Sequence, residues 1–176
     1  GYSDAARLLL SAPDSGIRHW GAVADHLEVE PGREKAVEAC LGDLLQYVVV
    51  PTRADAEAGL AFVRRHGTGR VGFLIVEGQN GEASPANSVD EALVSVVGGV
   101  RVDGDQAIAV RAELQDRWLA GSYDDAARAA TQTTAEIATP DGDVFHGTAL
   151  VSGGVKGEGL GILETKREIT ELEQRT

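Results

Sequence analysis

The sequence predicts an α+β fold of two similar lobes, in which helices alternate with short strands of a mixed β-sheet. Of its 176 residues, 43% are apolar and 25% are charged, which is typical of a globular chain with an aliphatic core. Apolar residues switch between helical spacing and short continuous runs. The order of these patterns in the first half recurs in the second half. The length suits one domain, or two small lobes with a shared core.

The first half predicts two helices that alternate with two strands, after a short leading helix. Ser3 is a suitable N-cap for the leading helix, over 2–10. Thr52 with Asp55 can cap another helix, which Gly67 ends. The strands are expected over 47–50 and 71–76. Two apolar helix faces are expected to point inward: Ala36, Val37, Cys40, Leu41 and Leu44 on the first, and Ala56, Leu60 and Val63 on the second.

The second half opens after a surface loop expected over 77–87, where Gly, Ser, Pro and Asn replace any periodicity. Ser88 and Glu91 have capping-box spacing, which predicts a helix that buries Leu93, Val96 and Val97. A further helix is expected over 105–119, which carries Ile108, Leu114 and Trp118. A short helix over 124–130, a hairpin of 135–139 with 144–146, and a strand over 148–152 complete the half.

The two halves show a weak internal repeat at a constant offset of 70 positions. Leu44 then matches Leu114, Val48 matches Trp118, and Thr52 matches Ser122. Such a duplication would produce two lobes that bury apolar faces against each other.

Charge and composition exclude several classes of protein. The net charge of −12 argues against a chain that binds nucleic acid over its whole surface, so any such contact must be local. No run approaches the roughly 20 apolar residues that span a bilayer, and no targeting signal is visible. The single cysteine, Cys40, favours a reducing, cytoplasmic setting and is expected to be a buried thiol. The chain lacks Met, which suggests a piece of a longer protein.

The C-terminal segment is the most informative. Five glycines within nine residues, at positions 153, 154, 157, 159 and 161, precede a charged helix. In that helix, Ile162, Ile169 and Leu172 fall at core positions of a heptad register. Two heptads are too few for a stable coiled coil, but they match the start of a long one.

Three further segments, GAVADHLEVEPGREKAVEACLGDLLQYVVV, GRVGFLIV and TPDGDVFHGTALVSGG, occur in an order that resembles the hinge domain of bacterial SMC (structural maintenance of chromosomes) proteins. The resemblance extends from about Ile17 to Gln174. It implies the SMC hinge fold, with the end of an incoming coiled-coil helix over 1–12 and the start of the outgoing one over 160–176. The two pseudo-symmetric lobes would cover 17–87 and 88–157.

The same resemblance implies a non-catalytic homodimerisation module that joins two coiled-coil arms. In the family, ATPase heads lie at the far ends of the arms, kleisin and accessory subunits bind elsewhere, and the assembly entraps DNA in the nucleoid. No cofactor, metal or membrane contact is expected of the hinge. For the dimer interface we expect bare main chain that lets a partner pack closely. The residues concerned are Gly147, Val151, Ser152, Gly153 and Gly154.

Two basic groups are candidates for weak, sequence-independent DNA contact. Lys156, Lys166 and Arg167 surround the start of the C-terminal helix, where dimerisation would double their charge. A solvated helix face with Glu neighbours is the alternative. Arg64 and Arg65, with nearby Arg70, form the second group. These residues could instead simply stabilise a helix C-terminus.

Other functions remain as alternatives. One is a dimerisation module without DNA contact. Another is a small α/β ligand-binding domain that uses the glycine-rich loop, although Lys156 follows Val155 and lacks the Ser or Thr of a P-loop. The four histidines have no metal-ligand spacing. No local catalytic motif is present, but a triad built from distant residues would leave none, so enzymatic activity stays a minor alternative.

Overall fold

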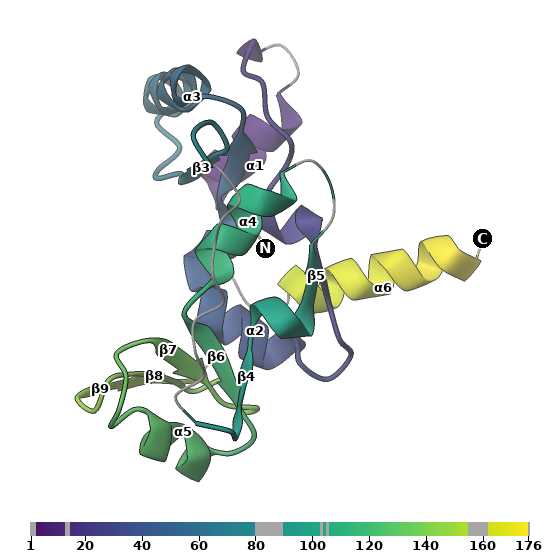
Figure 1. Ribbon diagram of the computed structural model, residues 1–176. Helices are drawn as coiled ribbons and strands as arrows, with labels where there is room; N and C mark the ends of the chain where they lie inside the picture. The colour runs from purple at the N-terminus through teal and green to yellow at the C-terminus, as the bar shows by residue number, and fades with distance from the viewer. Residues whose placement is uncertain are drawn as a thin grey trace.

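The computed structural model describes residues 3–12, 15–79, 90–102, 104, 106–154 and 162–175, and the fold has two halves built to one plan (Figure 1). Short 3-10 helices are labelled η. The elements of the first half are α1 Asp4–Ser11, η2 Val23–His26, β1 Leu27–Val29, α2 Glu34–Leu41, η3 Gly42–Gln46, β2 Val48–Val50, α3 Arg53–His66 and β3 Phe73–Ile75. Those of the second half are β4 Leu93–Ser95, η4 Val97–Gly99, β5 Val100–Val102, α4 Ala107–Leu114, β6 Arg117–Ala120, α5 Tyr123–Ala129, β7 Glu136–Ala138, β8 Val144–His146, β9 Leu150–Ser152 and α6 Ile162–Arg175.

Each half contains a parallel strand pair joined by a capped helix. In the first half, β2 and β3 pair in parallel around α3, and in the second half β6 and β7 pair in parallel around α5. Thr52 accepts a hydrogen bond from Asp55 N at the start of α3, as Ser122 does from Asp125 N at the start of α5. The backbone bond from Val23 N to Tyr47 O likewise matches the bond from Val96 N to Arg117 O. The two halves are therefore structural repeats.

The repeat corrects the constant offset expected from the sequence. Between β2 and β6 the offset is 70, because Val48 corresponds to Trp118, but between α2 and α4 it is 73, because Val37 corresponds to Val110. With this alignment EKAVEACL and AIAVRAEL match, and Leu41 meets Leu114. The segment between Leu114 and Trp118 is three residues shorter than the one between Leu41 and Val48. Helix periodicity alone does not reveal this difference in length.

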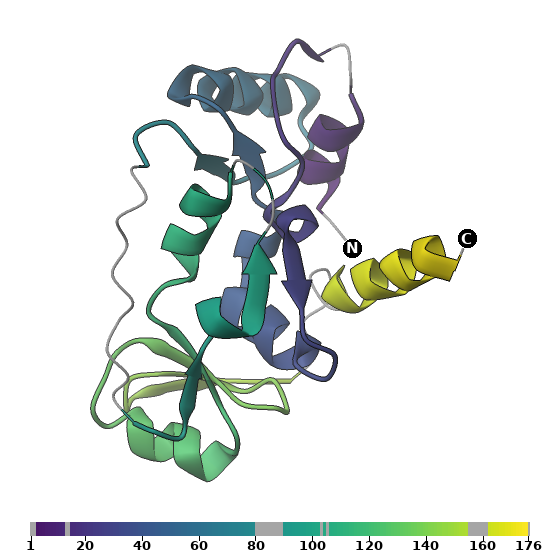
Figure 2. The ribbon, with the colours of Figure 1, turned by 45° about the vertical axis from the view of Figure 1, so that its right-hand side comes forward.

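The halves exchange their helices. α2 packs against β6 and β7 of the second half, whereas α4 packs against β3 of the first half. Strands β1 and β5 pair in antiparallel fashion between the halves, side by side near the middle of the molecule (Figure 2). Apolar residues of both halves, among them Val37, Val49 and Leu119, consequently form one buried cluster. Each half completes the core of the other, so neither half is an independent domain.

Arg117 fixes the ends of the exchanged helices. Its guanidinium donates to Cys40 O of α2 at 2.8 Å and to Glu113 O of α4 at 3.1 Å, and it pairs with Glu136 Oε2 at 2.6 Å. A cation is favourable at both helix C-termini because the last carbonyl groups there have no helical partners.

Most expected elements are present, including the hairpin of β7 and β8, the N-cap at Ser3, the inward face of α2 and the left-handed Gly67 that ends α3. The prediction of a helix that buries Leu93 and Val97 is wrong, because β4 and η4 occupy this segment. The expected cap of that helix, Ser88, lies outside the described residues. Burial alternates there, with Leu93 buried and Val94 exposed, which is a strand period. Most of the loop expected over 77–87 also lies outside the described residues.

Two smaller expectations are also wrong. Trp118 lies on β6 and not on a helix, because the chain turns at Asp116, which has a left-handed φ of 58°. Leu60 was expected inward but is exposed. Phe62 is buried in place of Leu60 and packs with Leu9 of α1.

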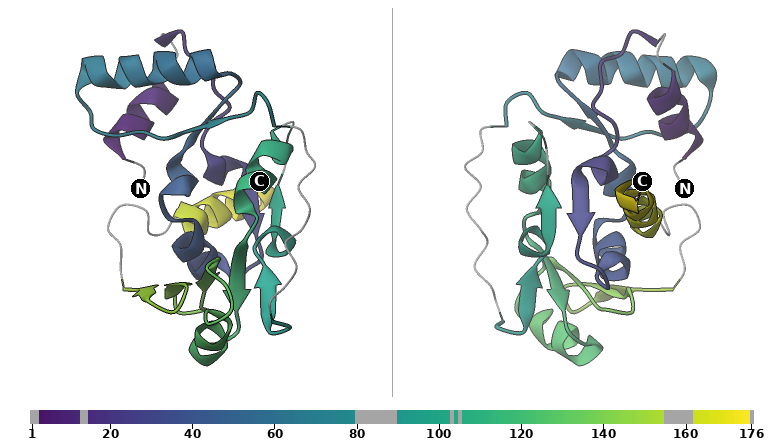
Figure 3. Two further views of the ribbon diagram at one scale, coloured as in Figure 1. Left: turned by 60° about the vertical axis from the view of Figure 1, so that its left-hand side comes forward. Right: turned by 90° about the vertical axis from the view of Figure 1, so that its right-hand side faces the viewer.

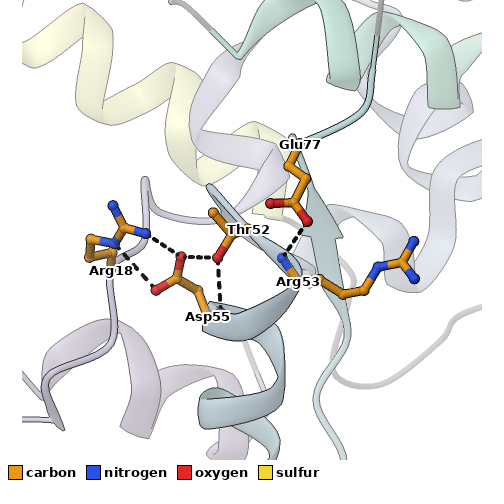
Figure 4. Close-up of polar contacts among 5 residues, drawn as sticks. All are labelled: Arg18, Thr52, Arg53, Asp55 and Glu77. Atoms are coloured by element: carbon orange, nitrogen blue, oxygen red, sulfur yellow. Dashed lines mark hydrogen bonds and ion pairs between the residues drawn. The ribbon is translucent and has the colours of Figure 1, made fainter.

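The start of α3 predicts an acid-dependent contribution to stability. A hydrogen bond from the Thr52 hydroxyl, and then Arg18 at 3.0 Å, lower the pKa of Asp55 (Figure 4). Because the folded pKa lies below the unfolded one, the contribution is present above about pH 4 and is lost as the pH falls through the folded pKa. We expect Asp55→Asn to lower stability to urea at pH 7, and this difference to shrink toward pH 3.

Glu57→Gln on the same helix is the matched control, because Glu57 is exposed and makes no ion pair within the described residues. A difference between Asp55→Asn and the unmodified chain that stays constant from pH 7 to pH 3 would contradict the prediction.

Candidate dimer interface and helical junction

Strand β9 forms one edge of the five-stranded sheet, whose order is β4-β6-β7-β8-β9. It pairs only with β8 in the described residues, and all three of its residues are exposed. Leu150 is 63% and Val151 is 53% exposed. A sheet edge that carries apolar side chains can template pairing with another chain.

The hairpin before β9 places Val151 at the end of an apolar row. Gly147 has φ 68°, a left-handed value that a β-branched residue would resist, and allows the turn between β8 and β9. Val151 then lies opposite Phe145, which Tyr123 of α5 covers with ring centroids 5.0 Å apart. Helix α5 thus covers this face of the sheet as far as Phe145. The neighbouring side chain on β9, Val151, is exposed.

The glycines after β9 have different roles. A Cβ on Gly153 would lie 2.1 Å from Asp143 Oδ1, so the chain itself occupies this space. Gly154 has φ 88°, and a Cβ placed on it would have no neighbour within 4 Å among the described residues. Of these two glycines, Gly154 therefore offers open main chain. At Gly153, the Asp143 side chain of the same copy occupies the space that a side chain would need. The remaining loop glycines, at 157, 159 and 161, lie outside the described residues.

A second open edge lies in the first half, at β3. Among the described strands, β3 pairs only with β2. Its counterpart in the repeat, β7, has β8 on the equivalent outer side, with Ile137 opposite Phe145. The sheet of the first half therefore ends where that of the second half continues.

Helix α6 leaves the body as a single projecting arm, and the right-hand view of Figure 3 looks nearly along it. Ile162 and Leu163 are buried at its start, whereas Ile169 and Leu172 are exposed further along. Lys166 Nζ donates to Ala24 O at 2.7 Å and also to Leu27 O. Arg167 pairs with Glu34 Oε1 at 3.0 Å. Both candidate DNA-contacting residues on α6 thus bind groups of their own chain, and Lys156 lies outside the described residues.

The basic residues at the end of α3 are in a different situation. Arg64, Arg65 and Arg70 are exposed, and no carboxylate lies within ion-pair distance of them in the described ranges. Arg65 lies over the ring of Phe62, 6.0 Å from its centroid. Among the described residues, their positive charge is therefore not neutralised by an ion pair.

Residues with catalytic or metal-binding chemistry have structural partners. Burial raises the pKa of the Cys40 thiol to about 12, which leaves the thiol protonated and a poor nucleophile. His19, His26 and His66 each form a hydrogen bond with backbone atoms. In the described part of the chain, no three His, Cys, Asp or Glu side chains are close enough to share a metal ion. Nor does that part contain a helix with the length and apolar character needed to cross a bilayer.

The site residues expected from the sequence do not include Leu150, the β3 edge, or the carboxylates Glu34 and Glu38. Both carboxylates are buried, at 4% and 7% exposure. Glu38 lies between Val37 and Leu41 on the apolar side of α2. An acidic residue flanked in this way was the available signal.

Two intertwined repeats with open sheet edges and a projecting helix define a class of α+β linker domain. The family model for "SMC proteins Flexible Hinge Domain" matches residues 17–130. The chain belongs to the SMC hinge family.

Two curated relatives are both described as "Chromosome partition protein Smc". The protein from Myxococcus xanthus is 31% identical over 170 residues, which cover 93% of this chain and 14% of the relative. The protein from Desulfitobacterium hafniense is 29% identical over 161 residues, which cover 88% of this chain and 13% of the relative. The chain thus spans about one seventh of these proteins.

Solved SMC hinges share the fold. The Geobacillus stearothermophilus hinge, solved as an asymmetric dimer, has a TM-score of 0.85 at 23% identity and covers 99% of this chain and 74% of that chain. The Pyrococcus furiosus hinge has a TM-score of 0.67 at 22% identity and covers 87% of this chain and 88% of that chain. These matches confirm the mixed α/β hinge fold expected from the sequence.

The contact at Gly153 yields a prediction about stability within one copy. Gly153→Ala should lower the free energy of unfolding by no more than about 1 kcal/mol, because the new methyl group overlaps the carboxylate end of the Asp143 side chain, which must rotate away. The measurement is urea unfolding of Gly153→Ala alone and combined with Asp143→Ala, which empties the space. If the second substitution recovers none of the loss, the clash is not its cause.

Proposed function

We propose that this chain is the homodimerisation hinge of an SMC protein, and that β9 of one copy adds to the β3 edge of the other. The observation that carries this proposal is the missing strand beside β3 among the described residues, at the position that β8 occupies in the repeat. A two-fold dimer would form this contact twice, because each copy has one β9 edge and one β3 edge. The result would be a closed pair in which the two β9 edges and the two β3 edges are covered.

The proposed interface includes Leu150 together with the residues expected from the sequence, which are Gly147, Val151, Ser152, Gly153 and Gly154. Leu150 and Val151 supply exposed apolar area, and Gly154 supplies main chain that a partner can approach. Gly147 and Gly153 act by shaping the hairpin from within. The dimer of the Geobacillus stearothermophilus hinge supports the proposal by analogy of fold.

We also propose that lobes over 17–87 and 88–157 lie between an incoming helix at 1–12 and an outgoing helix at 160–176. By analogy with the chromosome partition proteins, the dimer would join two coiled-coil arms of a nucleoid-associated ATPase in the cytoplasm. The ATPase heads and the sites for kleisin and accessory subunits would lie outside this chain. The hinge would act mechanically, without catalysis of its own.

Sedimentation equilibrium tests the dimer. We expect twice the chain mass at micromolar concentration for the unmodified chain. Val151→Lys should weaken dimerisation by about 100-fold or more, because two unpaired cations would be buried at the two symmetric contacts. Val94→Lys is the matched control, since Val94 is 41% exposed on β4, the opposite edge of the same sheet. A monomeric unmodified chain, or equal weakening by both variants, would refute the proposed interface.

We further propose weak, sequence-independent DNA contact at Arg64, Arg65 and Arg70, whose charges have no carboxylate partner within the described ranges. Lys156, Lys166 and Arg167 remain candidates, but the contacts of Lys166 and Arg167 within the chain favour a structural role for them. Because the net charge is −12, the contact should be weak and strongly dependent on salt.

Gel-shift titration with single- and double-stranded DNA over a salt series tests this contact. We expect Arg64→Glu with Arg65→Glu to abolish the shift. Arg101→Glu is the control, because Arg101 is also exposed but pairs with Glu28 at 3.5 Å. A shift that survives the double reversal would move the contact elsewhere, and no shift at low salt would favour a dimerisation module without DNA binding.

A further inference from the structure

Helix α2 buries two carboxylates, in a chain whose net charge is already −12. Glu34 is 4% and Glu38 is 7% exposed, on the side of α2 that faces the body. Burying a carboxylate is costly unless charged or hydrogen-bonding groups compensate it. The reason for their presence lies in the groups that they contact.

Both carboxylates contact α6. Glu38 Oε1 accepts the backbone N–H of Leu163 at 2.6 Å, in the first turn of α6, where backbone N–H groups lack helical partners. Glu34 Oε1 lies 3.0 Å from the Arg167 guanidinium, one turn further along. Glu34 Oε2 also accepts the N–H of Gly32 at 2.8 Å, which fixes the carboxylate in place.

Lys166 provides a third attachment, to a different element. Its ammonium donates to the carbonyl groups of Ala24 and Leu27, which lie within η2 and at the start of β1. The three attachments therefore reach α2, η2 and β1. Because they approach α6 from separate elements, they restrict both its tilt and its rotation.

The internal repeat shows that the fold itself does not require these acids. Helix α4 is the counterpart of α2, and the alignment that matches Val37 with Val110 places Ala107 at the position of Glu34 and Arg111 at that of Glu38. Both helices bury the same Ala, Val and Leu positions. Helix α2 packs against α6. The acids thus occur on the repeat helix that contacts the projecting helix.

We propose that Glu34, Glu38 and Lys166 are positioning residues that fix the direction in which α6 leaves the hinge. That α6 begins an arm rests on the proposed function, but its attachment does not. Since α2 also packs against β6 and β7, α6 moves as one body with the sheet that ends in β9. The angle between the arm and the proposed dimer contact is then set within each copy.

Distance measurement between two spin labels tests this proposal. The labels are placed at Glu57→Cys on α3 and Arg175→Cys at the end of α6, and labelled chain is diluted with unlabelled chain so that only distances within one copy contribute. Cys40 can stay, because it is buried with a pKa of about 12. Arg175 lies 12 residues beyond Leu163, roughly 18 Å along the helix axis, so a change of tilt produces a large change of distance.

We expect one narrow distance distribution for the parent chain and broad distributions for Glu38→Ala and for Glu34→Ala. Glu38→Gln should stay narrow, because its amide oxygen can accept the same N–H of Leu163. Glu168→Gln is the matched control for charge, since Glu168 is exposed on α6 and forms no hydrogen bond or ion pair with the body in the described residues. Narrow distributions in both alanine variants, or equal broadening in Glu168→Gln, would overturn the proposal.

Amide hydrogen exchange separates loss of the attachment from unfolding. In Glu38→Ala the amide of Leu163 should exchange at least tenfold faster, whereas that of Val37, which donates to Arg33 O within the body, should stay protected. If Glu38→Ala loses protection at Val37, Lys166→Ala takes its place in the distance measurement and is expected to broaden the distribution. A narrow distribution in Lys166→Ala would then overturn the proposal. Sedimentation of each variant reports dimerisation separately, so a failure of the proposed dimer is recognised independently.

Discussion

The exchange of helices between the two repeats is the constraint on which the rest of the structure depends. A small sheet covered by one helix cannot bury both of its faces, and in each repeat one helix of its own, α3 or α5, joins the parallel strands. Helix α2 covers the second face of β6 and β7, while α4 packs against β3. Arg117 holds the C-terminal ends of both helices together. Because each repeat completes the core of the other, the geometry between the repeats is fixed by burial and not by a linker.

This arrangement places the open edges and the projecting helix in a fixed relation. The β3 edge belongs to the first repeat and the β9 edge to the second, so the rigid core sets the separation between them. Helix α6 attaches to α2, which lies on the sheet of the second repeat. A dimer formed through these edges would therefore transmit its geometry to the arms through packed secondary structure. Such transmission would depend on packing and hydrogen bonds between the elements.

The candidate site could be predicted only in part. The edge strand β9 follows from local sequence, since a short apolar run after a glycine favours a strand. Gly147 was expected as open main chain at the dimer interface, whereas it lies in the turn between β8 and β9. The role of Gly153 could not be predicted, because its close neighbour Asp143 comes from another strand connection. Lys166 and Arg167 were interpreted as solvent-facing or DNA-contacting cations. Their partners Ala24, Leu27 and Glu34 lie more than 100 positions away in the chain, so no local pattern could reveal them.

By itself, the sequence determined the local elements and the family. Capping residues, helix periodicity and turn glycines depend on neighbours within a few positions, so the N-caps at Ser3 and Thr52 and the hairpin of β7 and β8 were confirmed. Only the tertiary structure decided that LVS at 93–95 forms a strand, because pairing with β6 supplies hydrogen bonds that a short helix there would lack. It also decided which sheet each helix covers and where α6 attaches. Those choices are made by burial and charge pairing between distant segments, for which a single sequence carries no local signal.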